Sequence, residues 1–373
     1  MYLRSVVVLL IAVLVNVESN VIDNQTYETC DDGYCLPKHL CPTGKADDGP
    51  ILEQNRLVAV RVGEENECGD FMKICCKKWE RKTRQVNNKC GVSNPQGLVY
   101  NVESELTYAK YAEFPWTVAI FEKPSSSDNP ELTHVGGGTL IHPKFVLTTA
   151  HTLKDSQRYV ARFGEWNMNS DAEAFPTQDI EIEEHILHQS YRVATILEND
   201  IALAVLKTNV IYSEHIRPIC LPSAQDNFED QQCIATGWGV DERTDEPATV
   251  MKRMELNVIS RKDCEMSYRL LDFPYRLHRS IMCGGATDDQ NICVKDGGSP
   301  LACQRADGSY VLAGIASWRR NCADYLDPGV FMNATRFACW INDTIADREQ
   351  SNEEVDGNDR FDFLMSRIFN IEP

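Results

Sequence analysis

The sequence predicts an all-β protein of antiparallel strands in a sandwich or barrel, preceded by a small disulfide-stapled module. From about residue 114, short apolar runs recur between clusters of Gly, Pro and Asp, which is typical of such folds. Six cysteines crowd into residues 30–76. A module this small buries too little apolar surface to fold on that alone, so three bridges must hold it, in any of fifteen connectivities.

The apolar runs give the expected strands of the larger domain, and a helix is expected to end it. The runs are WTVAIF (116–121), GTLI (138–141), KFVLTTA (144–150), IALAVL (201–206), CIATGWG (233–239) and YVLAGIASW (310–318). The stretch ATRFACWINDTI (334–345) predicts the closing helix, and an acidic segment (347–362) follows it. In the tail, Phe361, Leu364, Met365 and Ile368 fall on one helical face, which would dock on the domain or in a partner's groove.

The N-terminus and the composition indicate a secreted protein. Residues 1–19 read as a signal peptide, with Arg4 before an apolar run that is too short to span a bilayer. Fifteen cysteines then indicate disulfides rather than metal, and Asn24, Asn333 and Asn342 are candidate glycosylation sites. A net charge of −19 argues against nucleic acid or an anionic membrane as the main partner.

A basic segment, KKWERKTRQVNNK (77–89), follows the cysteine-rich module. It is polar and lacks apolar periodicity, so we expect it to be exposed and easily cut.

Three landmarks occur in the order of a base, a residue that orients it and a nucleophile loop. LTTAHT places His151 at the end of an apolar strand, NDIALAVL places Asp200 at the start of another, and CVKDGGSPLAC (293–303) comes last. Each landmark is weak alone, because a histidine after a strand is usually structural. Together they indicate the triad of an acyl-transfer enzyme.

At this point the sequence resembles the chymotrypsin-like serine proteases and, among them, the arthropod CLIP-domain proteins. EFPWTVAI, GGTLIHPKFVLTTAH, FGEW, IRPICLP, ATGWG, ASW and DPGVF match in order. The resemblance covers residues 30–76 and about 90–345, and implies two six-stranded antiparallel barrels with the triad in the cleft between them. The expected organisation is a signal peptide (1–19), a CLIP domain (30–76), a linker (77–113), a peptidase S1-like domain (114–345) and an acidic tail (346–373).

The loop departs from the family at the nucleophile. The family's order is Gly-Asp-Ser-Gly-Gly-Pro, whereas this chain reads Lys-Asp-Gly-Gly-Ser-Pro, so the nucleophile position falls on Gly297. Ser299 lies two residues along, a span of about 6–7 Å in extended chain. A nucleophile must approach its base to about 2.6–3.2 Å. We therefore expect an inactive homologue, the alternative being an active endopeptidase with a remodelled loop that uses Ser299.

Other family features are altered as well. The disulfide that flanks the triad histidine is absent, since its positions hold Gly136 and Thr152. In the family, an activating cut releases an α-amino group that pairs with the aspartate at the position of Asp296. Here no basic residue precedes the corresponding segment, Val102–Leu106, so neither this cut nor this partner is expected. An unpaired buried charge is costly, so Asp296 must have another partner.

The specificity pocket is predicted to be altered too. Asn291 stands at its base in place of an acid, and Arg319 stands where a glycine would leave its entrance open. Lys295 replaces a glycine whose N–H helps to form the oxyanion hole. His151 and Asp200 are then expected to persist as a pair that holds the shape of the cleft.

The resemblance also implies the disulfide pairing. The pairs are Cys30–Cys75, Cys35–Cys68, Cys41–Cys76, Cys90–Cys220, Cys233–Cys303, Cys264–Cys283 and Cys293–Cys322. Cys339 remains, as a buried thiol or as one half of an intermolecular bridge. A cut after Arg81, Lys82 or Arg84 would free the CLIP module, whereas a cut after Cys90 would leave the pieces tethered.

These features predict a secreted, non-catalytic homologue in extracellular fluid such as haemolymph. By resemblance, its partners are other CLIP-domain proteins and the prophenoloxidase system, and an upstream serine protease cleaves it. An adhesion or matrix role is the alternative binding function. No cofactor is expected; a Ca²⁺ ion in the acidic loop around Asp171 to Glu184 has no supporting ligand spacing.

Overall fold

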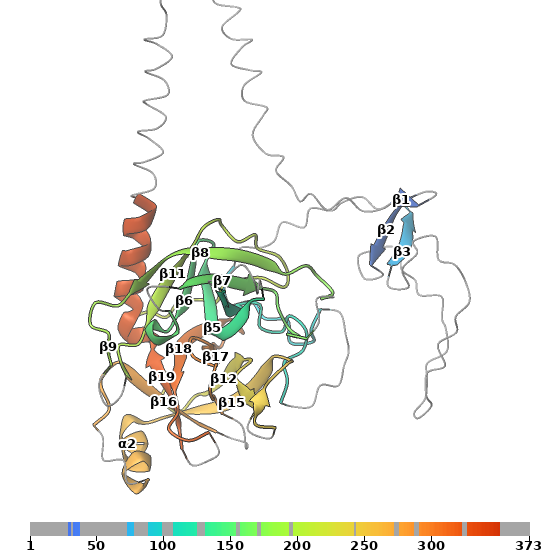
Figure 1. The fold of residues 1–373 in the computed structure, drawn as a ribbon. Helices are drawn as coiled ribbons and strands as arrows, with labels where there is room; N and C mark the ends of the chain where they lie inside the picture. The colour runs from blue at the N-terminus through green and yellow to red at the C-terminus, as the bar shows by residue number, and fades with distance from the viewer. Residues whose placement is uncertain are drawn as a thin grey trace, which may run out of the picture. The chain divides into compact units, whose positions relative to one another are not determined.

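A computed structural model gives the fold of the chain (Figure 1). It describes residues 29–30, 33–37, 73–77, 89–98, 107–124, 131–153, 157–169, 173–193, 197–241, 244–271, 276–286, 291–322 and 327–350. The chain divides into two units, Met1–Gln85 and Val86–Pro373. Several predicted features lie outside the described residues: the signal peptide, Asn24, the cut positions after Arg81, Lys82 and Arg84, Val102–Leu106, and the tail beyond residue 350.

The N-terminal unit contains a three-stranded antiparallel sheet. Its strands are β1 (Thr29–Cys30), β2 (Gly33–Pro37) and β3 (Lys73–Lys77), in the order β1-β2-β3. Cys35 lies opposite Cys75 in this register. Cys41 and Cys68 are outside the described residues, so the three predicted bridges of this unit stay a prediction.

Two closed six-stranded antiparallel barrels make up the described fold of the second unit, which confirms the predicted fold class. The first, in the order β11-β6-β5-β4-β7-β8, comprises β4 (Thr117–Lys123), β5 (Thr133–His142), β6 (Phe145–Thr148), β7 (Arg158–Phe163), β8 (Gln178–Leu187) and β11 (Ala202–Leu206). The second, in the order β12-β15-β16-β19-β18-β17, comprises β12 (Gln232–Gly237), β15 (Lys252–Ile259), β16 (Ile281–Ala286), β17 (Pro300–Gln304), β18 (Tyr310–Trp318) and β19 (Gly329–Asn333).

Shorter elements complete the unit. Two-stranded ribbons join β9 (Arg192–Val193) to β10 (Leu197–Glu198) and β13 (Val240–Asp241) to β14 (Glu246–Pro247). Helix α2 (Arg261–Leu270) begins where the Ser260 side chain accepts a hydrogen bond from the Asp263 N–H. The barrels meet at a buried hydrogen bond of 2.7 Å between the hydroxyls of Thr117 and Thr236.

The closing helix is longer than predicted. It covers residues 334–350 and is drawn in orange-red in Figure 1. It passes the expected end at residue 345 because its last turn pairs with the first barrel, through Arg348 to Glu184 at 2.6 Å and Glu349 to His142 at 3.2 Å. The first residues assigned to the acidic tail are therefore helical. No helix among the described residues has the length and apolar character needed to cross a membrane.

The candidate glycosylation sites that fall in this region differ in their surroundings. Asn333 is half-buried, and its side-chain oxygen accepts the N–H of Thr335 at the start of the closing helix. Asn342 is exposed on that helix. Glycosylation of either residue stays a prediction.

Four disulfides occur in the described part of the second unit. They are Cys90–Cys220, Cys233–Cys303, Cys264–Cys283 and Cys293–Cys322, the pairs that the resemblance implies. Cys339 has no disulfide partner and is exposed on the closing helix, so the expectation of a buried thiol is wrong.

Gly136 and Thr152 lie side by side beside His151. A Cβ atom built on Gly136 would lie 3.0 Å from the Thr152 Cγ2 atom. The Thr152 hydroxyl instead forms a 2.6 Å hydrogen bond with Thr149. A hydrogen bond and close packing therefore occupy the place where the family has a bridge.

The acidic loop after FGEW brings two carboxylates together. Glu165 and Glu173 both accept the backbone N–H of Trp166, and Arg162 pairs with Glu165 at 3.4 Å. Burial, and then the hydrogen bond to Glu165, raises the pKa of Glu173 to about 7. Asp171 is outside the described residues. Within those residues, no group of three or more His, Cys, Asp or Glu side chains could hold a metal ion.

Restoring the missing bridge should stabilise the protein. A Cβ atom at residue 136 would also lie 2.9 Å from the Gly297 carbonyl oxygen, so each Gly136→Cys variant must shift the loop slightly. We expect the Gly136→Cys/Thr152→Cys variant to form a disulfide and, because the closed loop has about 15 residues, its oxidised form to exceed its reduced form by about 2–3 kcal/mol in free energy of unfolding. Urea unfolding under oxidising and reducing conditions measures the gain. Each single cysteine variant is the control, and equal stability of the oxidised and reduced forms would contradict the predicted proximity.

Glu173 should lower stability at alkaline pH. Its pKa in the fold is above the unfolded value, so stability is full below pH 4.5 and is lost as pH rises through about 7. Glu173→Gln should therefore stabilise the protein at pH 8, by about 1 kcal/mol after allowance for solvent screening, and leave stability at pH 5 nearly unchanged. Urea unfolding at both pH values, with exposed Glu229→Gln as the control, tests this; an equal effect at both pH values would contradict it.

Candidate functional site

The histidine and aspartate of the predicted triad form a hydrogen-bonded pair. His151 lies in a 3-10 turn, η2 (Ala150–Thr152), that directly follows β6, and Asp200 precedes β11. The His151 Nδ1 and Asp200 Oδ2 atoms are 2.7 Å apart, and the backbone N–H of His151 donates to the other carboxylate oxygen, Oδ1, at 2.9 Å. The Ser317 hydroxyl also donates to the buried Asp200, at 2.5 Å. Because β6 and β11 are neighbours in one barrel, the fold itself brings the pair together.

Gly297 faces the free edge of this histidine. A Cβ atom built on Gly297 would lie 2.8 Å from His151 Nε2 and 2.9 Å from Cε1. The loop is fixed from both barrels, since Gly137 N–H donates to the Gly297 carbonyl and Gly298 N–H donates to the Ala316 carbonyl, each at 2.8 Å. The position of a nucleophile is therefore formed, but the residue there carries no side chain.

Ser299 points away from the histidine, into the interior. Its side chain is fully buried, and its hydroxyl has no hydrogen-bond partner among the described residues. The backbones of Gly137 and Gly237 lie against it so closely that neither has room for a Cβ atom. A hydroxyl enclosed in this way cannot reach a substrate, so the alternative of Ser299 as a nucleophile is not supported.

The loop retains the backbone N–H group at residue 295, where the family has a glycine of the oxyanion hole. The N–H groups of Lys295 and Gly297 have no hydrogen-bond acceptor within the described residues. Lys295 has a φ of 70°, a left-handed conformation that costs a lysine energy and that glycine adopts freely. Lysine in place of the family's glycine at residue 295 therefore keeps the backbone N–H and adds backbone strain.

Asp296 has a partner that sequence reasoning did not identify. Lys252, on β15, places its Nζ atom 2.7 Å from Asp296 Oδ2, and both side chains are buried. The backbone N–H groups of Gly239 and Cys293 also donate to this carboxylate, at 2.8 and 2.9 Å. The strand pattern KRMELNVI contained the signal, because Lys252 alternates in phase with the apolar residues of the buried face.

Asn291 and Arg319, the residues predicted to alter the specificity pocket, both bond to backbone groups. Asn291 is buried, and its oxygen accepts the N–H of Ile292 at 2.8 Å. Arg319 donates to the carbonyls of Asp327 and Cys322, at 2.8 and 3.1 Å. The Cys293–Cys322 disulfide joins the two segments that carry them. Both side chains are therefore held by the protein itself, and blocking of the pocket stays a prediction.

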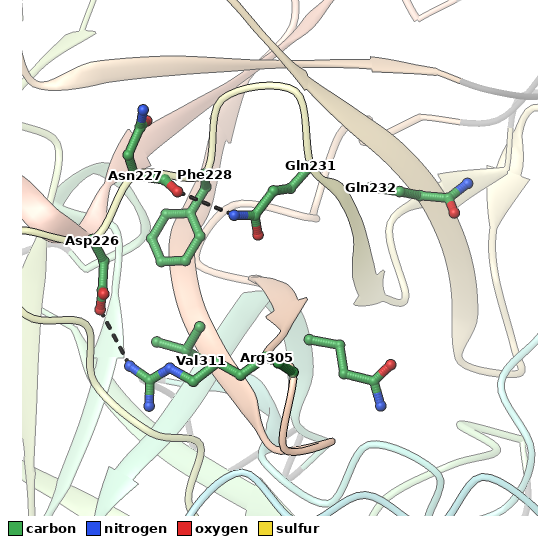
Figure 2. Close-up of a pocket in the computed structure, with 9 residues that line it drawn as sticks. Asp226, Asn227, Phe228, Gln231, Gln232, Arg305 and Val311 are labelled. Atoms are coloured by element: carbon green, nitrogen blue, oxygen red, sulfur yellow. Dashed lines mark hydrogen bonds and ion pairs between the residues drawn. The ribbon is translucent and has the colours of Figure 1, made fainter.

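A separate surface pocket of about 480 Å³ lies on the second barrel (Figure 2). It is lined by Asp226, Asn227, Phe228, Gln231, Gln232, Gln304, Arg305, Ala306 and Val311. Arg305 pairs with Asp226 at 3.2 Å, and Gln231 donates to the Asn227 carbonyl at 3.1 Å. The pocket includes neither the His151–Asp200 pair nor the Cys293–Ser299 loop, and its charged groups already satisfy each other.

Comparison with known proteins identifies the family. The Trypsin family matches residues 106–341. The mouse serine protease neuropsin is similar in structure, with a TM-score of 0.54 and 26% sequence identity, covering 64% of this chain and 98% of neuropsin.

Two mosquito relatives cover most of the chain. The chain is 47% identical over 329 residues to "Inactive CLIP domain-containing serine protease A8" of Anopheles gambiae, covering 85% of this chain and 90% of that protein. It is 38% identical to "Inactive CLIP domain-containing serine protease A28" of the same species, covering 94% and 99%. "Phenoloxidase-activating factor 2" of Galleria mellonella is 34% identical, covering 69% and 89%.

The fold, the preserved His151–Asp200 pair and these matches agree: the chain belongs to the trypsin family, as an inactive CLIP-domain serine protease homologue.

Proposed function

We propose that this chain is a secreted, non-catalytic cofactor or regulator of the extracellular protease cascade that activates prophenoloxidase in melanisation and innate immunity. It acts by binding: its cleft holds a protease or a zymogen in a productive arrangement without cutting it. An upstream serine protease controls it by cutting the basic linker.

One observation supports this role above the others, namely that Gly297 faces His151 at the position of the nucleophile. Hydrolysis needs a nucleophile against the base, and glycine offers none. The His151–Asp200 pair, the backbone donors of the loop and both barrels remain. A cleft that keeps its shape and loses its attacking group can bind a peptide segment and leave it uncut.

The relatives support the choice of cascade. Two are named inactive CLIP-domain proteases, and a third is named a phenoloxidase-activating factor. The four disulfides of the second unit agree with an oxidising, extracellular setting. The partners proposed are other CLIP-domain proteins and components of the prophenoloxidase system, with haemolymph as the location.

The linker explains how a cut could control the protein. Cys90 is bridged to Cys220, and the neighbouring Gly91 donates to the Pro218 carbonyl at 2.8 Å, so the second unit is anchored from this point onward. A cut after Arg81, Lys82 or Arg84 precedes that anchor and would release the CLIP module.

Depletion from haemolymph tests the proposal. Removal of the chain with a specific antibody should change phenoloxidase activity after microbial challenge, and recombinant chain should restore it. Recombinant chain treated beforehand with a serine-directed organophosphate should restore it equally, because no nucleophile is used. An unchanged activity would reject the cascade role, and restoration only by untreated protein would reject a non-catalytic one.

A linker variant separates binding from control by cleavage. The triple variant Arg81→Ala/Lys82→Ala/Arg84→Ala should fold as wild type and fail to restore phenoloxidase activity, because the upstream protease cannot cut it. Non-reducing gels of challenged haemolymph should show the CLIP fragment released from wild type and not from the variant. Full restoration by the uncut variant would contradict control by this cut.

A further inference from the structure

The buried Lys252–Asp296 ion pair joins two parts of the second unit that are far apart in the sequence. Lys252 belongs to β15 of the second barrel, and Asp296 belongs to the cleft loop between Cys293 and Ser299. The side chains are only 2% and 0% exposed, and their charged atoms are 2.7 Å apart. Two charges are removed from water here, so their pairing is needed to offset the cost of desolvation.

The pair is the centre of a larger set of bonds. The Lys252 ammonium also donates to the Val240 carbonyl at 3.1 Å, and the Asp296 carboxylate accepts two backbone N–H groups, from Gly239 and Cys293. The backbone of Gly239 lies directly against the carboxyl group, with no room for a Cβ atom. A hydrogen-bonded charge in so tight a site fixes both the loop and the segment after β12.

The surroundings of Asp296 show a strained backbone and, in the nearby His134, no second cation that could pair with the carboxylate. Lys295, just before Asp296, has a φ of 70°, and Gly297, just after it, faces His151. The nearby His134 cannot replace the lysine, because burial and then the charge of Lys295 lower its pKa to about 4, which leaves it neutral near pH 7. Lys252 therefore supplies the positive charge that pairs with Asp296 in this strained loop.

We propose that Lys252 is a built-in latch: its ammonium holds the cleft loop in its binding shape in the uncut chain. The loop then needs no α-amino group released by a cut, and cleavage elsewhere in the chain neither creates nor reshapes the cleft. The cleft loop is thus formed before any processing, and the linker cut of the proposed function would act by releasing the CLIP module and not by forming this loop.

Amide hydrogen exchange on the full-length, uncut protein tests the latch. Lys252→Met should leave the Asp296 carboxylate unpaired and speed exchange at the Gly239, Cys293 and Ser299 amides by about tenfold or more. Lys207→Met, which removes an exposed lysine paired with Glu181 on the first barrel, is the control and should leave these amides unchanged. Wild-type exchange rates in folded Lys252→Met would overturn the proposal.

Two further measurements keep the test decisive if Lys252→Met does not fold. The double variant Lys252→Met/Asp296→Asn leaves no buried charge unpaired, so it should fold and still show faster exchange at these amides. Wild-type protection in the double variant would mean that the disulfide and backbone bonds suffice, and would reject the latch. Wild-type protein cut in the linker should show loop exchange equal to that of uncut protein. A gain of about tenfold in protection after the cut would also overturn the proposal.

Discussion

The buried contact between Lys252 and Asp296 is the constraint on which the cleft depends. Asp296 lies between the strained Lys295 and Gly297, so the ion pair that fixes Asp296 also fixes the backbone on either side of it. Backbone bonds to Gly137 and Ala316 then hold the loop between the two barrels. Without the lysine, the buried carboxylate would be held only by two backbone N–H groups, and a buried charge that has lost its ion-pair partner is strongly destabilising.

The two barrels and the His151–Asp200 pair persist although the nucleophile is absent. His151 and Asp200 keep the hydrogen bond that orients a general base, and the N–H groups of Lys295 and Gly297 have no acceptor within the described residues. The serine that survives in the loop is enclosed by glycine backbones and has no exposed surface. The protein thus retains the oriented histidine and the two barrels of a protease, and it lacks the group that would attack a carbonyl.

Much of the fold and site could be predicted from the sequence, with limits that have physical causes. The strands follow from apolar runs, and the position of Gly297 follows from the cysteines and proline that anchor its loop. Lys252 was missed because it is 44 residues from Asp296, and strand alternation marks it as buried without naming its partner. Cys339 was wrongly expected to be buried, although Arg336 and Asn342, three residues away on either side, place it on the polar face of the helix.

Returning a nucleophile to residue 297 would show whether the missing side chain at this position is what removes reactivity. The Gly297→Ser variant should form a covalent adduct with a serine-directed organophosphate, because the His151–Asp200 pair is in place and the histidine ring can shift slightly to admit the new side chain. Mass spectrometry should find the adduct at position 297, and it should persist when Ser299→Ala is added. An adduct on wild-type protein would contradict the absence of a nucleophile, and no adduct on folded Gly297→Ser would contradict an intact His151–Asp200 base.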